Sequence, residues 1–444
     1  MRTSPPPLRR WALFLLAAVC AAPAAALEPF DIVVYGATPG GIVAAVAAAR
    51  EGASVALVAP GRFIGGMTAG GLGWVAPELR ARTGGIAREF YRQVGAEYRK
   101  EIAWSFEPHV AESIFERMVE KAGVKLFREE RLREDRGIKK KGHRIRRFIT
   151  DEGTVFAATV FVDATYEGDL MAEAGVPYDV GEVSRLPDSQ NYSFALCLTQ
   201  AAANRVEFPK PVTYDPARYG PWLARIEAIE QETGQPAGFD DMIVRQQLPG
   251  GKIVARAVTG SVGVEYLEAA WRERMAVWQA HMDFTAGLFY FLAREETVPE
   301  AVRHEAGRWG LCADEFAYTN HWPHQLHIPA GRRMRSEAPL NWQDTGGKTP
   351  DAIGLAEFRG RTLPIPYRIL CPPERKLRNL LVVVSASAGS GVGPALRRDP
   401  TAMVMGHAAG VAAAMAVSTG AAVQQIDVRT LRAKLAGQKA LLGE

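Results

Sequence analysis

The sequence predicts a mixed α/β fold in which a nucleotide-binding domain is interrupted by a second domain. Three observations predict it: a strand, glycine turn, helix and strand near the N-terminus, a second buried strand and small-residue helix near the C-terminus, and a long middle region without this alternation. Residues 31–35 form the first expected strand, residues 42–52 an Ala-rich helix and residues 53–58 the next strand. Such a β-α-β unit is typical of folds that bind dinucleotides.

The turn between the first strand and its helix carries the nucleotide prediction. Gly36 allows a tight turn, Thr38 stands where the second glycine of the usual fingerprint lies, and Gly41 lets the helix pack closely on the sheet. The peptide N–H groups at the start of the helix can hold a pyrophosphate, and the helix dipole favours that negative charge. The turn therefore predicts a dinucleotide site. The same residues also allow a nucleotide-free α/β core.

The first 26 residues predict export. Arg9 and Arg10 precede an apolar run over residues 11–19, and small residues at 22–26 offer a cleavage site. The run is too short to span a membrane, although an uncleaved anchor is the alternative. The two arginines also allow a twin-arginine signal. We expect a periplasmic or secreted protein, cleaved near Ala26, with no stable membrane insertion.

Charge and cysteine content exclude several classes of protein. The chain has 53 basic and 49 acidic residues, and cleavage after residue 26 removes three arginines and leaves the two signs almost balanced. A nucleic-acid-binding surface is therefore not expected. Cys197, Cys312 and Cys371 are far apart in sequence, so they allow one disulfide but form no C-x-x-C pair and no iron–sulfur motif.

The chain is long enough for two domains, and its elements predict how they interleave. A glycine-rich stretch at 61–73 is expected to approach a flat ligand, or else to be a mobile surface loop. The further expected elements before residue 175 are helices at 85–100 and 110–122, strands at 124–128 and 154–164, and a basic, solvated hairpin at 131–147. Asp163, just past a strand end, is well placed to meet a ligand hydroxyl.

The middle region loses the alternation of strands and helices. Residues 175–345 are rich in proline and tryptophan, with helices expected near 221–233 and 267–293. The nucleotide-binding fold resumes with a buried strand at 379–385 and a Gly/Ser turn at 386–394. A small-residue helix then runs to residue 417, with Asp399 as the expected N-cap and Pro400 at the first helical position.

Taken together, these blocks resemble the family of FAD-dependent oxidoreductases related to fumarate-reductase-type and glutathione-reductase-like flavoproteins. The resemblance covers nearly all of the chain after residue 26, in order. It rests on a Gly-x-Thr-Pro-x-Gly turn and ten further short blocks, at residues 36–41, 65–68, 70–73, 106–112, 163–169, 192–194, 197–199, 363–367, 385–387, 397 and 406–410.

The resemblance implies a Rossmann-like FAD-binding domain with an interleaved substrate or cap domain. Its expected boundaries are residues 27–174 and 346–444 for the FAD-binding domain and residues 175–345 for the cap. The residues that it places on or near FAD are Gly36, Thr38, Pro39, Gly40, Gly41, Ala59, Pro60, Gly65, Gly66, Met67, Thr68, Asp163, Gly389, Arg397 and Gly406.

Three departures from the family pattern affect the expected site. Ala59 and Pro60 stand where an acid usually holds the adenosine ribose. Residues 329–333 keep Arg332 and Arg333 but lack half of a polar cluster. Ala388 stands where a histidine commonly follows the Ser-Ala-Ser turn, so the usual chemistry near the flavin is in doubt.

Oxidation by a flavin needs a base for the departing proton and groups that hold the substrate. The candidates are His109, His327, Arg333 and Arg397. His109 is alternatively a capping or packing residue, and the arginines, with Arg332, alternatively form structural salt bridges. His321, His324 and His327 are spaced like metal ligands, but Pro323 breaks the helix that would align them and no acid lies among them. We therefore predict no metal.

The sequence thus predicts an exported FAD-dependent oxidoreductase that transfers a hydride from a small organic or carbohydrate-like substrate to flavin N5. Its expected electron acceptor is oxygen, a quinone or a small redox protein. One alternative is a flavin- or ligand-binding protein of the same fold that has lost catalysis, which the altered positions 59, 329–331 and 388 suggest. A flavin monooxygenase that works with a reductase is the other.

Overall fold

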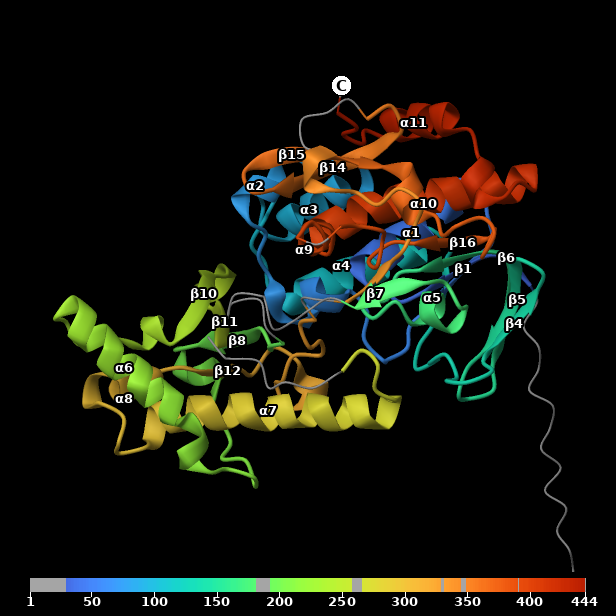
Figure 1. Ribbon diagram of the computed structural model, residues 1–444. Helices are drawn as coiled ribbons and strands as arrows, with labels where there is room; N and C mark the ends of the chain where they lie inside the picture. The colour runs from blue at the N-terminus through green and yellow to red at the C-terminus, as the bar shows by residue number, and fades with distance from the viewer. Residues whose placement is uncertain are drawn as a thin grey trace, which may run out of the picture.

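The computed structural model describes residues 29–180, 192–257, 266–328, 331–344, 349–389 and 391–443. These residues form two lobes of unequal size (Figure 1). The expected signal peptide, residues 329 and 330 of the altered cluster and Ser390 of the Gly/Ser turn lie outside the described residues.

The larger lobe contains both ends of the described chain. Its first part comprises β1 (Phe30–Tyr35), α1 (Pro39–Arg50), β2 (Val55–Val58), α2 (Pro77–Arg80), α3 (Gly85–Glu97), α4 (Pro108–Lys121), β3 (Lys125–Phe127), β4 (Ile138–Lys141), β5 (Arg144–Ile149), β6 (Val155–Asp163), α5 (Asp169–Glu173) and β7 (Tyr178–Val180). Its second part comprises β13 (Arg332–Met334), β14 (Ala352–Phe358), β15 (Arg361–Pro366), β16 (Leu380–Val382), α9 (Gly393–Leu396), α10 (Asp399–Thr419) and α11 (Val428–Gly437).

A seven-stranded sheet forms the centre of this lobe. Strands β3, β2, β1 and β6 pair in that order and all run parallel. The nine-residue β6 pairs with antiparallel β5 along its first half and with parallel β16 along its second half. The strands of residues 30–58 are almost continuously apolar, as expected of a parallel sheet that is covered on both faces. The carboxyl ends of β1, β2, β6 and β16 therefore meet at one edge of the sheet.

Helices α1 and α10 cross in close contact, which joins the two parts of the lobe. A Cβ on Gly406 would lie 2.1 Å from the carbonyl oxygen of Gly40, and a Cβ on Gly410 would lie 2.2 Å from that of Ala44. The two backbones can approach only because these positions lack side chains. Among the described residues, α10 is also the one helix long and apolar enough to cross a membrane, but most of it is buried inside the protein.

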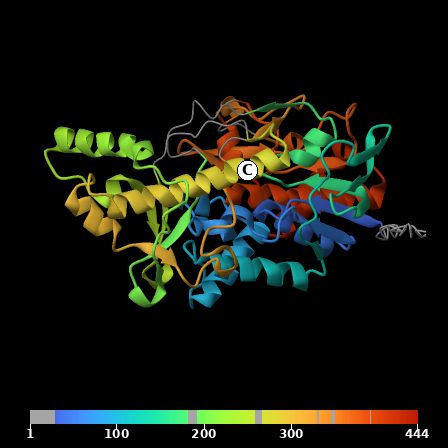
Figure 2. The same ribbon diagram turned by 90° about the horizontal axis from the view of Figure 1, so that it is seen from below.

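The smaller lobe is built on an antiparallel sheet. Its elements are β8 (Leu196–Thr199), β9 (Arg205–Val206), α6 (Gly220–Thr233), β10 (Ile243–Gln247), β11 (Ile253–Ala257), α7 (Trp271–Arg294), α8 (Glu300–Ala306) and β12 (Gly310–Cys312). The strands lie in the order β10-β11-β8-β12-β9. The 24-residue α7 runs from this lobe to the larger one, as the view from below shows (Figure 2).

The cysteines that the sequence left unassigned are all buried thiols in the structure. Cys197 on β8 and Cys312 on β12 lie on neighbouring antiparallel strands, with their sulfur atoms 3.0 Å apart. Cys371 lies elsewhere, beside the carbonyl oxygen of Val423. The one disulfide that the sequence allows would therefore join Cys197 to Cys312.

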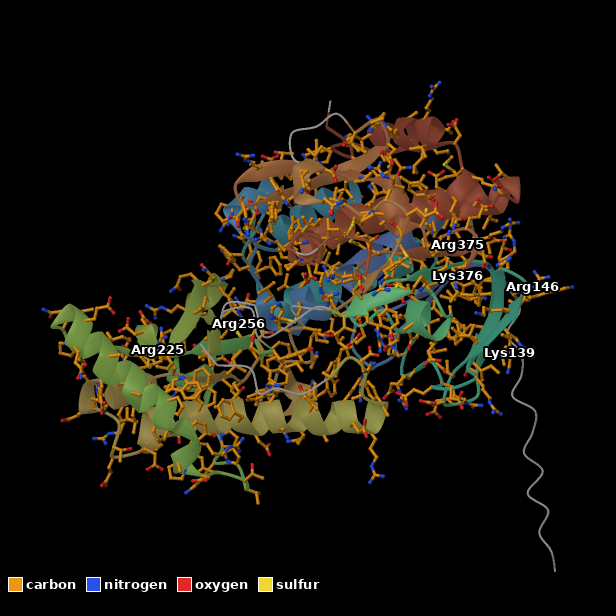
Figure 3. All side chains as sticks on the ribbon, viewed as in Figure 1. Lys139, Arg146, Arg225, Arg256, Arg375 and Lys376 are labelled. Carbon is orange, nitrogen blue, oxygen red and sulfur yellow. The ribbon has the colours of Figure 1, made fainter. Side chains whose placement is uncertain are left out.

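The expected elements are confirmed with small shifts at their ends, with one correction. The helix expected at 85–100 spans Gly85–Glu97, and the basic hairpin is β4 with β5, whose lysines and arginines are mostly exposed (Figure 3). The prediction that Asp399 caps the last long helix is wrong. Arg398 is the N-cap of α10, and the Asp399 carboxylate instead binds side chains from two other segments.

Candidate active site

The turn after β1 is shaped by two glycines and a threonine. Gly36 has a φ of +103°, and a Cβ there would lie 2.7 Å from the backbone of Ala164, which follows β6. A Cβ on Gly41 would lie 1.9 Å from the carbonyl oxygen of Gly36. The Thr38 hydroxyl accepts a hydrogen bond from Gly41 N at 3.2 Å and donates one to the carbonyl oxygen of Ala164 at 2.7 Å. Thr38 is therefore the N-cap of α1 and ties the turn to the neighbouring strand.

A cavity of about 560 Å³ lies at this turn, outside the carboxyl ends of β1 and β2. Open parallel sheets bind their ligands at this edge. Five of the residues predicted to contact the cofactor line the cavity: Gly36, Thr38, Ala59, Pro60 and Gly66. Gly66 has a φ of +48°, and a Cβ there would lie 2.4 Å from the Tyr166 hydroxyl, so the backbone must stay bare at this point of the wall.

Part of the wall of the first cavity is a network of charged side chains. The Arg274 guanidinium, on α7, holds the Asp169 carboxylate with two hydrogen bonds of 2.8 and 3.0 Å. Arg332 binds the same carboxylate at 2.7 Å and Glu268 at 2.9 Å. Burial alone would raise the pKa of Asp169, but the hydrogen bonds and charge of the two arginines outweigh it and lower that pKa. The salt-bridge alternative is thus confirmed for Arg332, and this network fixes α7 to the larger lobe.

Tyr166 lies in the walls of both this cavity and a second one. Its hydroxyl accepts a hydrogen bond from Met67 N at 2.9 Å and donates one to Asp399 at 2.8 Å. The Thr68 hydroxyl donates to the other oxygen of Asp399 at 2.6 Å. Burial raises the pKa of Asp399 to about 6, although these two hydrogen bonds oppose the shift. The network joins the glycine-rich loop, the turn after β6 and the start of α10.

The second cavity, of about 680 Å³, contains two of the four predicted catalytic residues. His327 and Arg397 line it, together with Met67 from the glycine-rich loop. Nη2 of Arg397 donates to the carbonyl oxygens of Tyr166 and Ile328, both at 2.9 Å. Its Nε and Nη1 are buried and have no hydrogen-bond partner among the described residues, and burial lowers the pKa of this guanidinium. Unused donors of this kind fit a ligand with a carbonyl or anionic edge.

Eight of the predicted cofactor contacts support the walls of the cavities instead of lining them: Pro39, Gly40, Gly41, Gly65, Thr68, Asp163, Gly389 and Gly406. The Asp163 carboxylate is buried and accepts hydrogen bonds from Thr165 N, Thr165 Oγ1 and Met171 N at 3.0, 2.7 and 2.7 Å. Burial raises its pKa to about 6. Asp163 therefore shapes the turn that carries Thr165 and Tyr166 to the cavity, and Gly406 serves the α1–α10 crossing.

His109 lies outside both cavities, at the start of α4. Its Nδ1 is 2.7 Å from an oxygen of Glu315, a carboxylate that is only 1% exposed, and that hydrogen bond raises the pKa of the imidazole. The Lys252 ammonium bridges Glu315 at 3.3 Å, Asp314 at 2.7 Å and Glu107 at 2.5 Å. Glu107, His109 and Glu315 have metal-ligand spacing, but this ammonium already lies among the carboxylates. His109 is thus neither the N-cap of α4, which is Glu107, nor a packed side chain, because its imidazole is exposed and hydrogen-bonded to Glu315.

Arg333, His321 and His324 lie in different surroundings. Arg333 lies on β13, against Gly393, and lines neither cavity. The His321 ring contacts the carbonyl oxygen of Glu315, whereas the His324 ring stacks on Phe63 with a centroid separation of 3.4 Å and lines the first cavity. Burial lowers the pKa of His324 to about 4. The three histidines at spacing three thus point to three different surroundings.

Two residues that line the cavities, Tyr166 and Arg256, were not among the predicted site residues. Tyr166 lies inside the block 163–169 that belongs to the family resemblance, but Asp163 was the residue of this block predicted to contact the cofactor. Arg256 lines the second cavity from β11, in the region where no strand was expected. The sequences Ile-Val-Arg-Gln-Gln of β10 and Ile-Val-Ala-Arg-Ala of β11 do not alternate between apolar and polar residues, so no local pattern singles out Arg256.

Comparison with known proteins identifies the relatives of this fold. A family described as FAD dependent oxidoreductase matches residues 31–435. No curated protein sequence matches the chain. Among solved structures, L-proline dehydrogenase from P. horikoshii has a TM-score of 0.40 and 14% identity, over 92% of this chain and 99% of the other. A geranylgeranyl bacteriochlorophyll reductase-like protein from Thermoplasma acidophilum has a TM-score of 0.41 and 14% identity, over 92% and 83%. Similarities this low say nothing about the reaction.

Proposed function

The chain belongs to the family of FAD-dependent oxidoreductases, its cofactor is FAD, and on that premise we propose that it oxidises a small organic or carbohydrate-like substrate by hydride transfer to flavin N5. One observation carries this proposal: two cavities share Tyr166, one at the Gly36 turn and the other lined by His327 and Arg397. A dinucleotide is long enough to need both, with its nucleotide half at the turn and its reactive half beside the histidine.

The residues present fit FAD. The bare backbone at Gly36 and Gly66 leaves room for the cofactor, and the start of α1 faces the same cavity, where a pyrophosphate is favoured. The buried, unused donors of Arg397 suit the carbonyl edge of the flavin or the substrate. Because Ala59 brings no carboxylate to the ribose position, we expect FAD to be held mainly through its pyrophosphate and flavin.

Bound FAD supplies an acceptor for two electrons and leaves the protein to place the substrate and take its proton. We assign the proton to His327, whose imidazole lines the second cavity. Arg397 stabilises negative charge, and its two hydrogen bonds to backbone carbonyls hold the guanidinium in place. Oxygen, a quinone or a small redox protein would then take the electrons. Cleavage near Ala26 would place this reaction in the periplasm or outside the cell, which N-terminal sequencing of the exported protein tests.

The proposal is tested by mixing the FAD-loaded protein, without oxygen, with a panel of alcohols, amines and sugars and following loss of the visible flavin band. Each class of compound is included in a neutral form and in a form that carries a carboxylate or phosphate. We expect at least one member to bleach the flavin, and His327→Asn to slow that step by about 100-fold or more while FAD still binds. His304→Asn is the matched control, because His304 is exposed on α8. A flavin that no substrate and no chemical reductant bleaches would contradict the proposal and favour a binding protein that has lost catalysis.

A further inference from the structure

One face of a β-hairpin in the smaller lobe forms a wall of the second cavity. Strands β10 and β11 pair antiparallel, with Val244 opposite Arg256 and Gln246 opposite Val254. All four of these residues line the cavity. Because side chains two apart on a strand share a face, the hairpin presents a continuous surface of two valines, a glutamine and an arginine. Figure 3 shows Arg256 on the side of the smaller lobe that faces the larger one.

Arg256 contributes a cation to this wall. Its side chain is half-buried, and its guanidinium makes no hydrogen bond or ion pair with any residue that the structure describes. Burial lowers the pKa of its guanidinium, which means that its charge is poorly solvated. The preceding arginine in the chain, Arg245 on β10, is by contrast paired with Asp240 and lies outside the cavity. A half-buried cation that no described acid pairs with gains from an anionic partner, so a ligand anion is the natural partner of Arg256.

The carboxylates of the same cavity are already engaged. Glu357 accepts a hydrogen bond from Arg398 at 2.8 Å, and Glu78 lies 3.5 Å from the same arginine. Asp399 is held by Thr68 and Tyr166. None of these three acids forms an ion pair with Arg256 in the described structure, and their other partners leave Arg256 as a positive charge in the cavity wall.

We propose that Arg256 binds an oxyanion of the substrate, so that the oxidised molecule is a small organic acid or phosphate ester and not a neutral alcohol, amine or sugar. The inference rests on the proposed function, because it takes the second cavity as the substrate site. A guanidinium presents two parallel N–H donors, which match the two oxygens of a carboxylate or phosphate. Arg256 would then be a specificity-determining residue on the cap, facing the reactive groups supplied by the larger lobe.

The test compares anions with neutral molecules of the same shape. Isothermal calorimetry on the purified protein measures binding of benzoate against benzamide, lactate against lactamide, and phenyl phosphate against phenol. We expect at least one anion to bind about tenfold or more tightly than its neutral partner, and that anion tells carboxylate from phosphate recognition. Arg256→Met should reduce the preference to less than about twofold, and Arg256→Lys should leave an intermediate one, because lysine keeps the charge but not the paired donors.

Arg245→Met is the matched control and should keep the full preference, since Arg245 lies on the same hairpin but outside the cavity. If Arg256→Met fails to fold, Arg256→Gln replaces it. The inference is overturned if no anion is preferred by the unmodified protein, or if the preference survives loss of Arg256, which would assign it to Arg397. Neither result depends on the flavin, because calorimetry measures binding of the anion. Failure of the proposed function would instead be seen as a colourless protein or as a flavin that does not react.

Discussion

At the scale of single residues, Tyr166 has the most central position in the site. It is buried, lines both cavities, and links the Met67 backbone to the Asp399 carboxylate. The family pattern alone did not single it out, because its importance comes from contacts with residues about 100 and 230 positions away in the chain. Such partners are set by the fold, not by the local sequence.

Tyr166→Phe is therefore expected to weaken FAD binding about tenfold. The change leaves Met67 N and one oxygen of Asp399 without their partner, and an unsatisfied buried group costs about 1–3 kcal/mol. Titration of the FAD-free protein with FAD, followed by quenching of flavin fluorescence, measures the dissociation constant. Tyr91→Phe is the control, because the buried Tyr91 hydroxyl has no hydrogen-bond partner among the described residues. Equal affinity in the Tyr166 variant and the unmodified protein would show that the network does not support the cofactor site.

A second residue-scale prediction concerns acid sensitivity. His281 on α7 is 4% exposed, its Nε2 has no hydrogen-bond partner among the described residues, and burial lowers the pKa of its imidazole from 6.5 to about 4. The folded protein therefore keeps His281 neutral between pH 6.5 and 4, whereas the unfolded chain takes up a proton there. The stabilising contribution of neutral His281 is therefore complete above pH 6.5. As the pH falls from 6.5 to 4, protonation of His281 in the unfolded chain lowers the free energy of unfolding by up to about 3 kcal/mol.

His281→Leu should accordingly lose less stability than the unmodified protein between pH 7.5 and pH 4.5. Thermal melting at the two pH values measures this difference, and His304→Leu, at an exposed position on α8, is the control that should not change it. An identical fall in melting temperature for the His281 variant and the unmodified protein would mean that this histidine accepts a proton without cost to the fold.

At the scale of elements, the contact of α1 with α10 holds the interleaved lobe together. Gly410→Ala is expected to lower the stability of the protein by about 2 kcal/mol, because the new methyl group would lie 2.2 Å from the carbonyl oxygen of Ala44 and the helices would have to separate. Gly437→Ala, in α11, is the control: its Cβ would meet no atom within 4 Å, and alanine favours the helix. Thermal melting compares the two, and a stable Gly410 variant would show that the crossing tolerates side chains.

The elements of the larger lobe could be predicted because their signals are local. The strand expected at 154–164 is β6 at Val155–Asp163, and the helix expected at 110–122 is α4 at Pro108–Lys121. Apolar runs, glycine turns and helix periodicity are properties of neighbouring residues. The sheet of the smaller lobe was missed because its strands are two to five residues long and because, apart from the β10–β11 hairpin, they pair over long distances along the chain.

In the candidate site, too, features that depend on the local backbone could be predicted, whereas those that depend on contacts between distant segments could not. The role of the Gly36 turn could be predicted because a glycine after a strand indicates a tight turn. The structure places Gly36 and Thr38 in the cavity wall. The role expected of Asp163 depended on where a side chain points, and its carboxylate is instead used by the turn that follows it. Arg256 could not be singled out before the β10–β11 pairing was known, because an arginine on an unrecognised strand looks like any surface arginine.

At the scale of the whole molecule, α7 and the Asp169 network hold the two lobes together, and the proposed function has FAD bound between them. The larger lobe supplies the glycine turn, Tyr166 and Arg397, and the smaller lobe supplies Arg256. Variation confined to the β10–β11 hairpin would alter the substrate and leave the flavin in place.

The visible spectrum of the purified protein, before and after denaturation, tests the central claim most directly. The account predicts flavin absorbance in the native protein and FAD released into the supernatant on denaturation, in spite of the missing carboxylate at Ala59. A colourless protein that also fails to take up added FAD would contradict it, and the assignments of His327, Arg397 and Arg256 to a reaction would fall with it.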